Sequence, residues 1–215
     1  MVARLRLRQP EPCGAVVEPV RIHLRFTEEA AQDLREQDFA LLSLALRPGL
    51  PRAEARKLSR ATLQDALQHH FGCDANAVSV ETASGNAPVV KVGRQRVHVS
   101  FSYEKDWAFI ALDMCSPIGI DVTFIHHQAE WIEECAKVAR EYLAPAISRK
   151  IEGLAGLERA IAFAEEWALH EARLKCRGLP LQEWTSELEV RLSGMRSGSL
   201  GDIEGFMVAY ARKEN

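Results

Sequence analysis

Residues 118–124 read IGIDVTF, and this stretch decides how the whole chain is organised. Apolar residues at its even positions alternate with glycine, aspartate and threonine at the odd positions. A period of two is typical of a strand with one buried face. Helices followed by strands are expected before Ser116-Pro117, and the same order begins again after this dipeptide. We therefore expect a change from one half of the fold to the other here.

The residues before this stretch predict helices and then strands. Thr27 is followed by two glutamates and an apolar pattern of helical spacing, which is typical of a helix N-cap. Gly72 is expected to end a second helix. The expected elements are a strand at 21–26, helices at 27–46 and 52–70, and strands at 77–81, 88–92, 97–102 and 107–113.

The residues after this stretch repeat that order. The expected elements are helices at 129–143, 146–151 and 157–176, followed by strands at 187–192 and 203–211. Two successive blocks of helices and strands favour an α+β fold over a parallel sheet built from βαβ units. We predict an N-terminal α+β half at residues 1–116 and a C-terminal α+β half at residues 117–215.

Composition and charge exclude several classes of protein. A formal net charge of −3 and a pI of about 6.2 give no electrostatic reason to expect nucleic acid or an anionic membrane as partner. The five cysteines are scattered and form no CxxC pair, which argues against a zinc site or a disulfide framework. No apolar run approaches the roughly 18 residues of a membrane span, and no secretory signal is recognisable. We expect a cytoplasmic protein.

Asp121 is the first candidate for chemistry. Gly119 and Thr123 lie on the same face of the predicted strand, so the aspartate has a glycine on one side and a hydroxyl on the other. A glycine at this position would let a ligand or another backbone come close. The alternative is a solvent-facing aspartate on an edge strand, and the pattern leaves both interpretations open.

The second candidate is one face of the helix predicted at 157–176. Steps of four place Trp167, Glu171 and Lys175 in one row. A carboxylate and a lysine one turn apart can serve a metal-assisted phosphoryl transfer, because the carboxylate binds Mg²⁺ or a proton and the lysine meets phosphate charge. The alternative is an exposed ion pair of Glu171 with Lys175, which would contribute only about 0.3–0.5 kcal/mol.

These candidates coincide in one known pattern. Residues 117–122, PIGIDV, resemble the GID motif of the phosphopantetheinyl transferases, and residues 167–175, WALHEARLK, resemble that family's W-x-x-K-E-A-x-x-K helix. Upstream, residues 97–102, VHVSFS, are similar to the family's F-N-x-S-H-S strand, and residues 85–88, GNAP, to its G-K-P turn. The similarity covers roughly residues 50–195, and the length resembles that of the monomeric, surfactin-synthetase-activating type.

The resemblance implies a fold and a reaction. Members of the family have two α+β halves related by a pseudo-twofold, with coenzyme A in the cleft between them. The implied enzyme is a Mg²⁺-dependent phosphopantetheinyl transferase of the holo-[acyl-carrier-protein] synthase type. Such an enzyme moves 4′-phosphopantetheine from coenzyme A to a serine of an acyl or peptidyl carrier protein.

The resemblance also implies roles for individual residues. Asp121 and Glu171 would hold Mg²⁺ together with oxygens of the coenzyme A pyrophosphate and water. Glu171 would take the proton of the attacking serine, directly or through a water, and Lys175 would stabilise the charge that develops on coenzyme A. Arg60 and Ser100 would bind the nucleotide phosphates.

Four residues depart from the family pattern. Thr123 stands where this type has a third acid, while Ala87, Phe101 and His170 stand where it has cationic residues, two of them contacts to coenzyme A. Each charged hydrogen bond contributes about 1.5–3 kcal/mol, so other basic residues would have to replace the missing ones. The sequence offers Arg56, Lys57, Lys91 and Arg94 as replacements.

Two other classes of function stay open. The four departures are compatible with a degenerate family member that binds carrier protein or coenzyme A without transfer. A hydrolase could use the same metal site to cleave a pyrophosphate.

Overall fold

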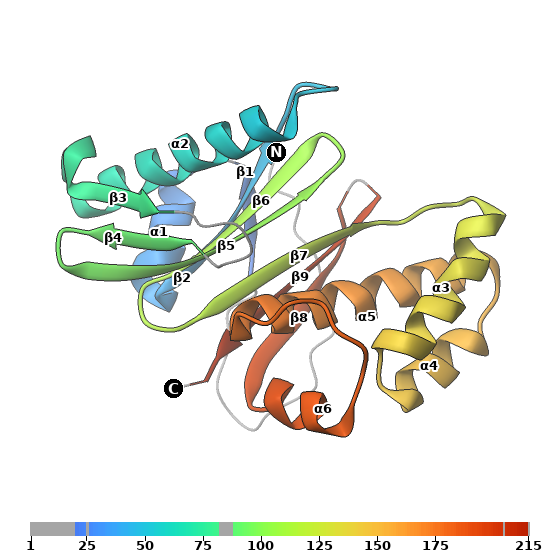
Figure 1. Ribbon diagram of the computed structural model, residues 1–215. Coiled ribbons are helices and arrows are strands. Elements are labelled where there is room, and N and C mark those ends of the chain that lie inside the picture. The colour runs from blue at the N-terminus through green and yellow to red at the C-terminus, as the bar shows by residue number, and fades with distance from the viewer. Residues whose placement is uncertain (1–19, 25, 82–87, 204, 215) are drawn as a thin grey trace.

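A computed structural model describes residues 20–24, 26–81, 88–203 and 205–214. The described residues form an α+β fold with two sheets, which confirms the predicted fold class. One sheet has six strands in the order β1-β2-β6-β5-β4-β3, and the other has three strands in the order β7-β9-β8 (Figure 1). β6 ends at Asp113 in the first sheet and β7 begins at Ile118 in the second.

The elements follow one another closely along the chain. In order they are β1 (Ile22–Leu24), α1 (Glu28–Gln37), β2 (Phe39–Ala45), α2 (Arg52–Phe71), the 3-10 turn η1 (Ala75–Ala77), β3 (Val78–Glu81), β4 (Val89–Val92), β5 (Gln95–Glu104), β6 (Trp107–Asp113), β7 (Ile118–Phe124), α3 (Ala129–Tyr142), α4 (Pro145–Glu152), α5 (Gly156–Arg177), α6 (Ser186–Leu192), β8 (Met195–Ile203) and β9 (Phe206–Lys213). No described helix is both long and apolar enough to cross a membrane.

The prediction of one helix at 27–46 is right at its start and wrong at its end. Thr27 is the N-cap, and its hydroxyl accepts the backbone N–H of Ala30. The helix ends at Asp38, which has a left-handed backbone with φ 62°. Residues 39–45 then form β2, which lies inside the sheet between β1 and β6. A strand that is buried on both faces has no period of two, so its apolar run was mistaken for a continuing helix.

The prediction of a strand at 187–192 is wrong. These residues belong to α6, whose N-cap Thr185 accepts the backbone N–H of Leu188. Leu188, Val190 and Leu192 alternate as in a strand, but Val190 is 73% exposed while the two leucines are buried. The buried pair therefore has the spacing of four that a helix needs. The strand before β9 is instead β8.

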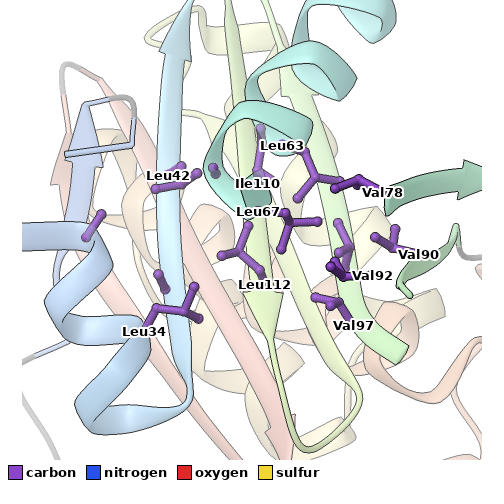
Figure 2. Packing of buried hydrophobic residues seen from close by; sticks show 14 residues of the cluster. Leu34, Leu42, Leu63, Leu67, Val78, Val90, Val92, Val97, Ile110 and Leu112 are labelled. Atoms are coloured by element: carbon purple, nitrogen blue, oxygen red, sulfur yellow. The ribbon is translucent and has the colours of Figure 1, made fainter. Parts of the chain in front are cut away.

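The helices α1 and α2 cover one face of the six-stranded sheet (Figure 1). Leu63 and Leu67 of α2 pack against Ile110 and Leu112 of β6, and Leu34 of α1 belongs to the same cluster (Figure 2). In β5 the residues that face this cluster are the odd-numbered ones from Val97 to Phe101. The side chains between them point to the opposite face of the sheet.

That opposite face packs on the three-stranded sheet. Leu41, Phe109 and Ala111 of the larger sheet share a core with the apolar face of β7 and with β9. The far face of the smaller sheet is covered by α5 through four alanines spaced along the helix. These are Ala160, Ala164, Ala168 and Ala172. The molecule thus has four layers, with two helices outside the first sheet and α5 outside the second.

A buried ion pair joins the ends of the two sheets. Asp113, the last residue of β6, is 0% exposed, and its Oδ2 lies 2.9 Å from an Nη2 of Arg212 in β9. Its Oδ1 accepts the backbone N–H groups of Cys115 and Ser116, each at 2.8 Å. The guanidinium of Arg212 also lies over the ring of Phe39, 4.5 Å from its centroid. Asp113 therefore holds the backbone of the segment that follows β6 and also ties β6 to β9 through Arg212.

Candidate functional site

The site lies where β5, β7 and α5 meet. Among the described strands, β7 pairs along one edge with β9, so the backbone groups of its other edge need partners elsewhere. The Ser100 hydroxyl accepts the N–H of Ile120 at 3.2 Å, and the Lys175 ammonium donates to the C=O of Ile120 at 3.1 Å. Polar side chains of β5 and α5 thus satisfy the open edge of β7 and join the two sheets.

Asp121 is a buried and paired carboxylate. It is only 7% exposed, which excludes the solvent-facing aspartate that the sequence left open. Its Oδ1 accepts the hydroxyl of Ser102 at 2.9 Å and the ammonium of Lys175 at 2.6 Å. None of the hydrogen bonds within the described residues uses its second oxygen, Oδ2, which leaves that oxygen for a ligand.

Lys175 is the centre of this network. Besides Asp121 and Ile120, its ammonium contacts the Ser102 hydroxyl at 3.2 Å and the C=O of Phe101 at 3.5 Å. The ion pair that the lysine forms is thus with Asp121 of β7, and not with Glu171 on its own helix as in the alternative above. Its side chain is 29% exposed, so the charge lies at the boundary between interior and solvent.

Gly119 explains how α5 comes so close to β7. A Cβ atom at this position would lie 2.6 Å from the backbone nitrogen of Cys176 and closer still to the carbonyl oxygen of Ala172. Real Cβ atoms essentially never lie within 3.0 Å of another heavy atom of this kind. The glycine in the motif therefore makes room for another backbone and not for a ligand, and it sets the distance from Asp121 to the side chains of α5.

Glu171 is the second carboxylate of the site. Burial raises the pKa of Glu171, repulsion from the Asp121 carboxylate raises it further, and Lys175 offsets part of this rise. The two acids are therefore close enough to interact, although within the described residues no group of three or more His, Cys, Asp or Glu side chains could hold a metal ion by itself. Such a pair fits a Mg²⁺ ion that takes most of its ligands from substrate phosphates and water.

We expect Glu171→Gln to stabilise the free protein at high pH. Because the folded state binds the Glu171 proton more tightly than the unfolded state, stability falls as pH rises above the ordinary pKa of 4.5 and through the raised value. Without metal, the variant should melt roughly 2–4 °C above the wild type at pH 8, the shift that about 1 kcal/mol gives in a chain of this size. At pH 4 the two melting temperatures should agree.

A matched control for this measurement lies on the same helix. Burial also raises the pKa of Glu166, which pairs with Lys150 at 3.7 Å on the α4 side of α5. Glu166→Gln should therefore stabilise the fold in the same way while leaving any activity intact. If Glu171→Gln melts at the same temperature as the wild type at pH 8, burial of the ionised Glu171 carboxylate does not destabilise the fold.

Ser100 lies beside this cluster and Arg60 does not. The Ser100 hydroxyl is engaged with the backbone of β7, as described above. Arg60 is partly buried on α2, which covers the other face of the six-stranded sheet. No hydrogen bond or ion pair within the described residues joins Arg60 to Asp121, Glu171 or Lys175. Ser102 is the member of the network that was not predicted, and its only signal was a small hydroxyl two residues after Ser100 in a strand.

The positions that depart from the family pattern have different surroundings. Thr123 follows Asp121 on the same face of β7 and is partly exposed. Phe101 packs into the core under α2 and stacks on Tyr103. His170 is buried, and its Nε2 is among the buried atoms of the described residues that have no hydrogen-bond partner. Ala87 lies outside the described residues, as does most of the turn at 85–88.

A basic cavity of about 100 Å³ lies at the turn between β5 and β6. Its cationic lining residues are Arg47, Arg52 and Lys105, and the Arg52 guanidinium lies 5.1 Å from the ring centroid of Tyr103. The remaining lining residues are Leu46, Leu50, Ala55 and Asp106. Arg56, Lys57, Lys91 and Arg94, which the sequence offered as replacements, are exposed and do not line this cavity.

Glu104 connects the cavity to the carboxylates. Burial raises its pKa, nearby His126 and Lys105 lower it, and the Asp121 carboxylate raises it. This half-buried acid at the end of β5 therefore feels both the basic cavity and Asp121. Two acids that can hold a divalent cation, with a lysine paired to one of them, form an arrangement that can bind and activate a phosphate ester.

The comparisons with known proteins point to the same chemistry. Residues 117–209 match the family model of the 4′-phosphopantetheinyl transferase superfamily. The matched segment contains Asp121, Glu171 and Lys175, and it spans β7 and α5 with the structure between them. No curated protein sequence matches the chain.

Proposed function

Since residues 117–209 match the family model of the 4′-phosphopantetheinyl transferase superfamily, we propose that this chain transfers the 4′-phosphopantetheine group of coenzyme A to a serine of an acyl or peptidyl carrier protein. One observation carries this proposal. Asp121 and Lys175 come from different elements of the matched segment and form a 2.6 Å ion pair, with Glu171 one helical turn before the lysine. An exposed or scattered set of the same residues would not support the chemistry.

The donor set fits a divalent cation of the Mg²⁺ type. Asp121 offers its free Oδ2 and Glu171 adds a second carboxylate, and Mg²⁺ sites in phosphoryl-transfer enzymes use one or two carboxylates with substrate phosphates. When bound, the cation would neutralise charge on the pyrophosphate of coenzyme A. Thr123 brings no third negative charge, so we expect weaker binding of the cation than a site with three acids would give.

We assign to Glu171 the role of general base, which accepts the proton of the carrier serine. The carrier serine attacks the β-phosphorus of coenzyme A, a new P–O bond forms, and the bond to 3′,5′-ADP breaks. The serine proton passes to the Glu171 carboxylate, directly or through a water. A carboxyl whose pKa is raised towards the working pH is a better general base than an ordinary glutamate. Lys175, paired with Asp121 at 2.6 Å, is the cation that we assign to the charge developing on the leaving group.

Coenzyme A lies, in this proposal, in a cleft between the N-terminal half, to residue 116, and the C-terminal half from residue 117. The basic cavity belongs to the N-terminal half and offers Arg47, Arg52 and Lys105 as further contacts for phosphate groups. These three residues would compensate for the cationic contacts missing at Ala87 and Phe101. Arg60 and Ser100 stay proposed contacts of the nucleotide phosphates.

We expect Arg52→Ala to raise the KM for coenzyme A by about 10-fold or more, with a smaller change in kcat. The loss of one charged hydrogen bond to a phosphate accounts for such an effect. Arg56→Ala is the matched control, since Arg56 is an exposed arginine one turn further along α2. Equal KM values for Arg52→Ala and the wild type would remove the cavity from the coenzyme A site.

Intact-mass spectrometry tests the proposed function directly. An apo carrier protein from the same genome, incubated with this chain, coenzyme A and Mg²⁺, should gain the mass of one phosphopantetheine. No gain with any carrier while coenzyme A still binds would favour the second candidate, a family member that binds without transfer. The observation behind this alternative is that a partly buried phenylalanine, Phe101, and a buried histidine, His170, stand where the family has cations.

We further propose that the enzyme is a monomer of the cytoplasm. The acids, the lysine and the basic cavity all come from one chain, so the site needs no second copy. Within the described residues, Cys73, Cys115, Cys135 and Cys176 are free thiols, which suits a reducing compartment.

A further inference from the structure

We propose that Lys175 is a built-in counter-ion that keeps divalent-cation binding weak in the free enzyme, so that the cation binds tightly only together with coenzyme A. This inference rests on the proposed function for the identity of the substrate. It assigns to the lysine a part in the loading of the site, in addition to any contact with the leaving group.

The contacts of Lys175 carry the first step. Its ammonium lies 2.6 Å from Oδ1 of Asp121, closer than any other acceptor it has. The other three acceptors among the described residues are neutral, namely the Ser102 hydroxyl and the carbonyl oxygens of Ile120 and Phe101. The positive charge of the lysine is therefore matched by Asp121, the carboxylate that a cation would need most.

The charge of the site carries the second step. Asp121 and Lys175 cancel each other, so a divalent cation that approaches the carboxylate without substrate meets an ammonium already in place. Both groups are withdrawn from water, with side chains 10% and 29% exposed, and charges that are partly buried interact more strongly than charges on the surface. A bare cation can compete only by displacing the lysine or by accepting its repulsion.

The substrate changes this balance. The pyrophosphate of coenzyme A brings negative charge and oxygen acceptors, so it can satisfy the ammonium and the cation together. The Lys175 side chain is partly exposed at the end of a flexible stem, so it can turn from Asp121 to a phosphate without disturbing α5. Binding of the cation and of coenzyme A must then strengthen each other by the same factor, as linkage requires.

Binding of Mn²⁺ to the full chain, followed by electron paramagnetic resonance of the free ion, tests the inference without carrier protein or turnover. The wild type should bind Mn²⁺ weakly alone and at least about 10-fold more tightly with coenzyme A. Lys175→Met should bind Mn²⁺ alone about 10-fold more tightly than the wild type, and coenzyme A should add little. Lys150→Met is the control, since Lys150 is exposed and pairs with Glu166 away from the site.

A second variant protects the test against misfolding. Lys175→Gln removes the charge but keeps donors for Asp121 and Ile120, and thermal unfolding of both variants shows whether they fold. Mn²⁺ binding in either folded variant that is equal to or weaker than in the wild type overturns the inference, as does tight Mn²⁺ binding by the wild type without coenzyme A. A chain that shows the expected Mn²⁺ pattern but modifies no carrier would sink the proposed function and leave the counter-ion role standing.

Discussion

Asp121→Asn should slow phosphopantetheine transfer by about 10²–10³-fold or more, the cost of losing one group that stabilises charge in a transition state. The asparagine keeps an oxygen that can accept the Ser102 hydroxyl and the Lys175 ammonium, so the network can persist. What the variant loses is the negative charge, and with it the attraction for a divalent cation. Single-turnover transfer to an apo carrier, measured by intact mass, gives the rate without interference from product release.

The control for this variant is Asp65→Asn, an exposed aspartate on α2. It should transfer at the wild-type rate, and both variants should show the wild-type circular dichroism spectrum. Transfer by Asp121→Asn within a factor of a few of the wild type would contradict the assignment of Asp121 to the cation. The acceleration of the transfer would then have to come from Glu171 and Lys175 without Asp121.

Gly119→Ala should be the most destabilising single-methyl change in the site. Overpacking of an interior costs about 1–3 kcal/mol and occasionally more, and here the atoms in the way belong to the backbone of α5 and cannot rotate aside. We expect a loss of at least about 3 kcal/mol in the free energy of unfolding, seen as a lower urea midpoint. Transfer should fall as well, because α5 must move away from β7 and take Glu171 and Lys175 with it.

Gly153→Ala separates this effect from the general cost of replacing a glycine. Gly153 has an ordinary right-handed backbone, and a Cβ there would meet its nearest neighbour at 3.5 Å, an ordinary contact distance. This control should be neutral or stabilising by up to about 1 kcal/mol. A Gly119→Ala protein with the midpoint of the wild type would mean that α5 and β7 tolerate a wider spacing than the structure has.

The fold was predictable where an element has a clear period or is bounded by turn residues. β7 alternates, α5 has a helical apolar stripe, and β6 is apolar on both faces but is preceded by polar turn residues, so their bounds follow closely from the sequence. β2 was missed because it is an inner strand of the six-stranded sheet and is apolar on both faces. Whether a strand is an inner one depends on its neighbours in the sheet and not on its own residues. The sequence of α6 fits a strand period of two and a helical period equally well. Packing of Leu188 and Leu192 against α5 and β8 selects the helix.

The candidate site was predictable as a set of residues but not as a network. Asp121, Glu171 and Lys175 could be named because a resemblance joined two motifs 46 positions apart, counted from Asp121 to Trp167. The partner of Lys175 could not be predicted, since helical spacing favours Glu171 and only packing of α5 on β7 brings Asp121 nearer. The basic cavity was missed for a similar reason. Arg47 and Lys105 are 58 positions apart and meet only through the pairing of β2 with β6.

The ion pair of Asp113 with Arg212 affects how this chain can fold while the ribosome is synthesising it. Asp113 ends a strand in the middle of the first sheet, but its partner is synthesised 99 residues later, after all the helices that the structure describes. In the complete fold this carboxylate is fully buried, and removing one partner of a buried ion pair costs about 3–5 kcal/mol. The nascent six-stranded sheet is therefore held back from its final stability until β9 emerges, which makes folding of both sheets a single late event.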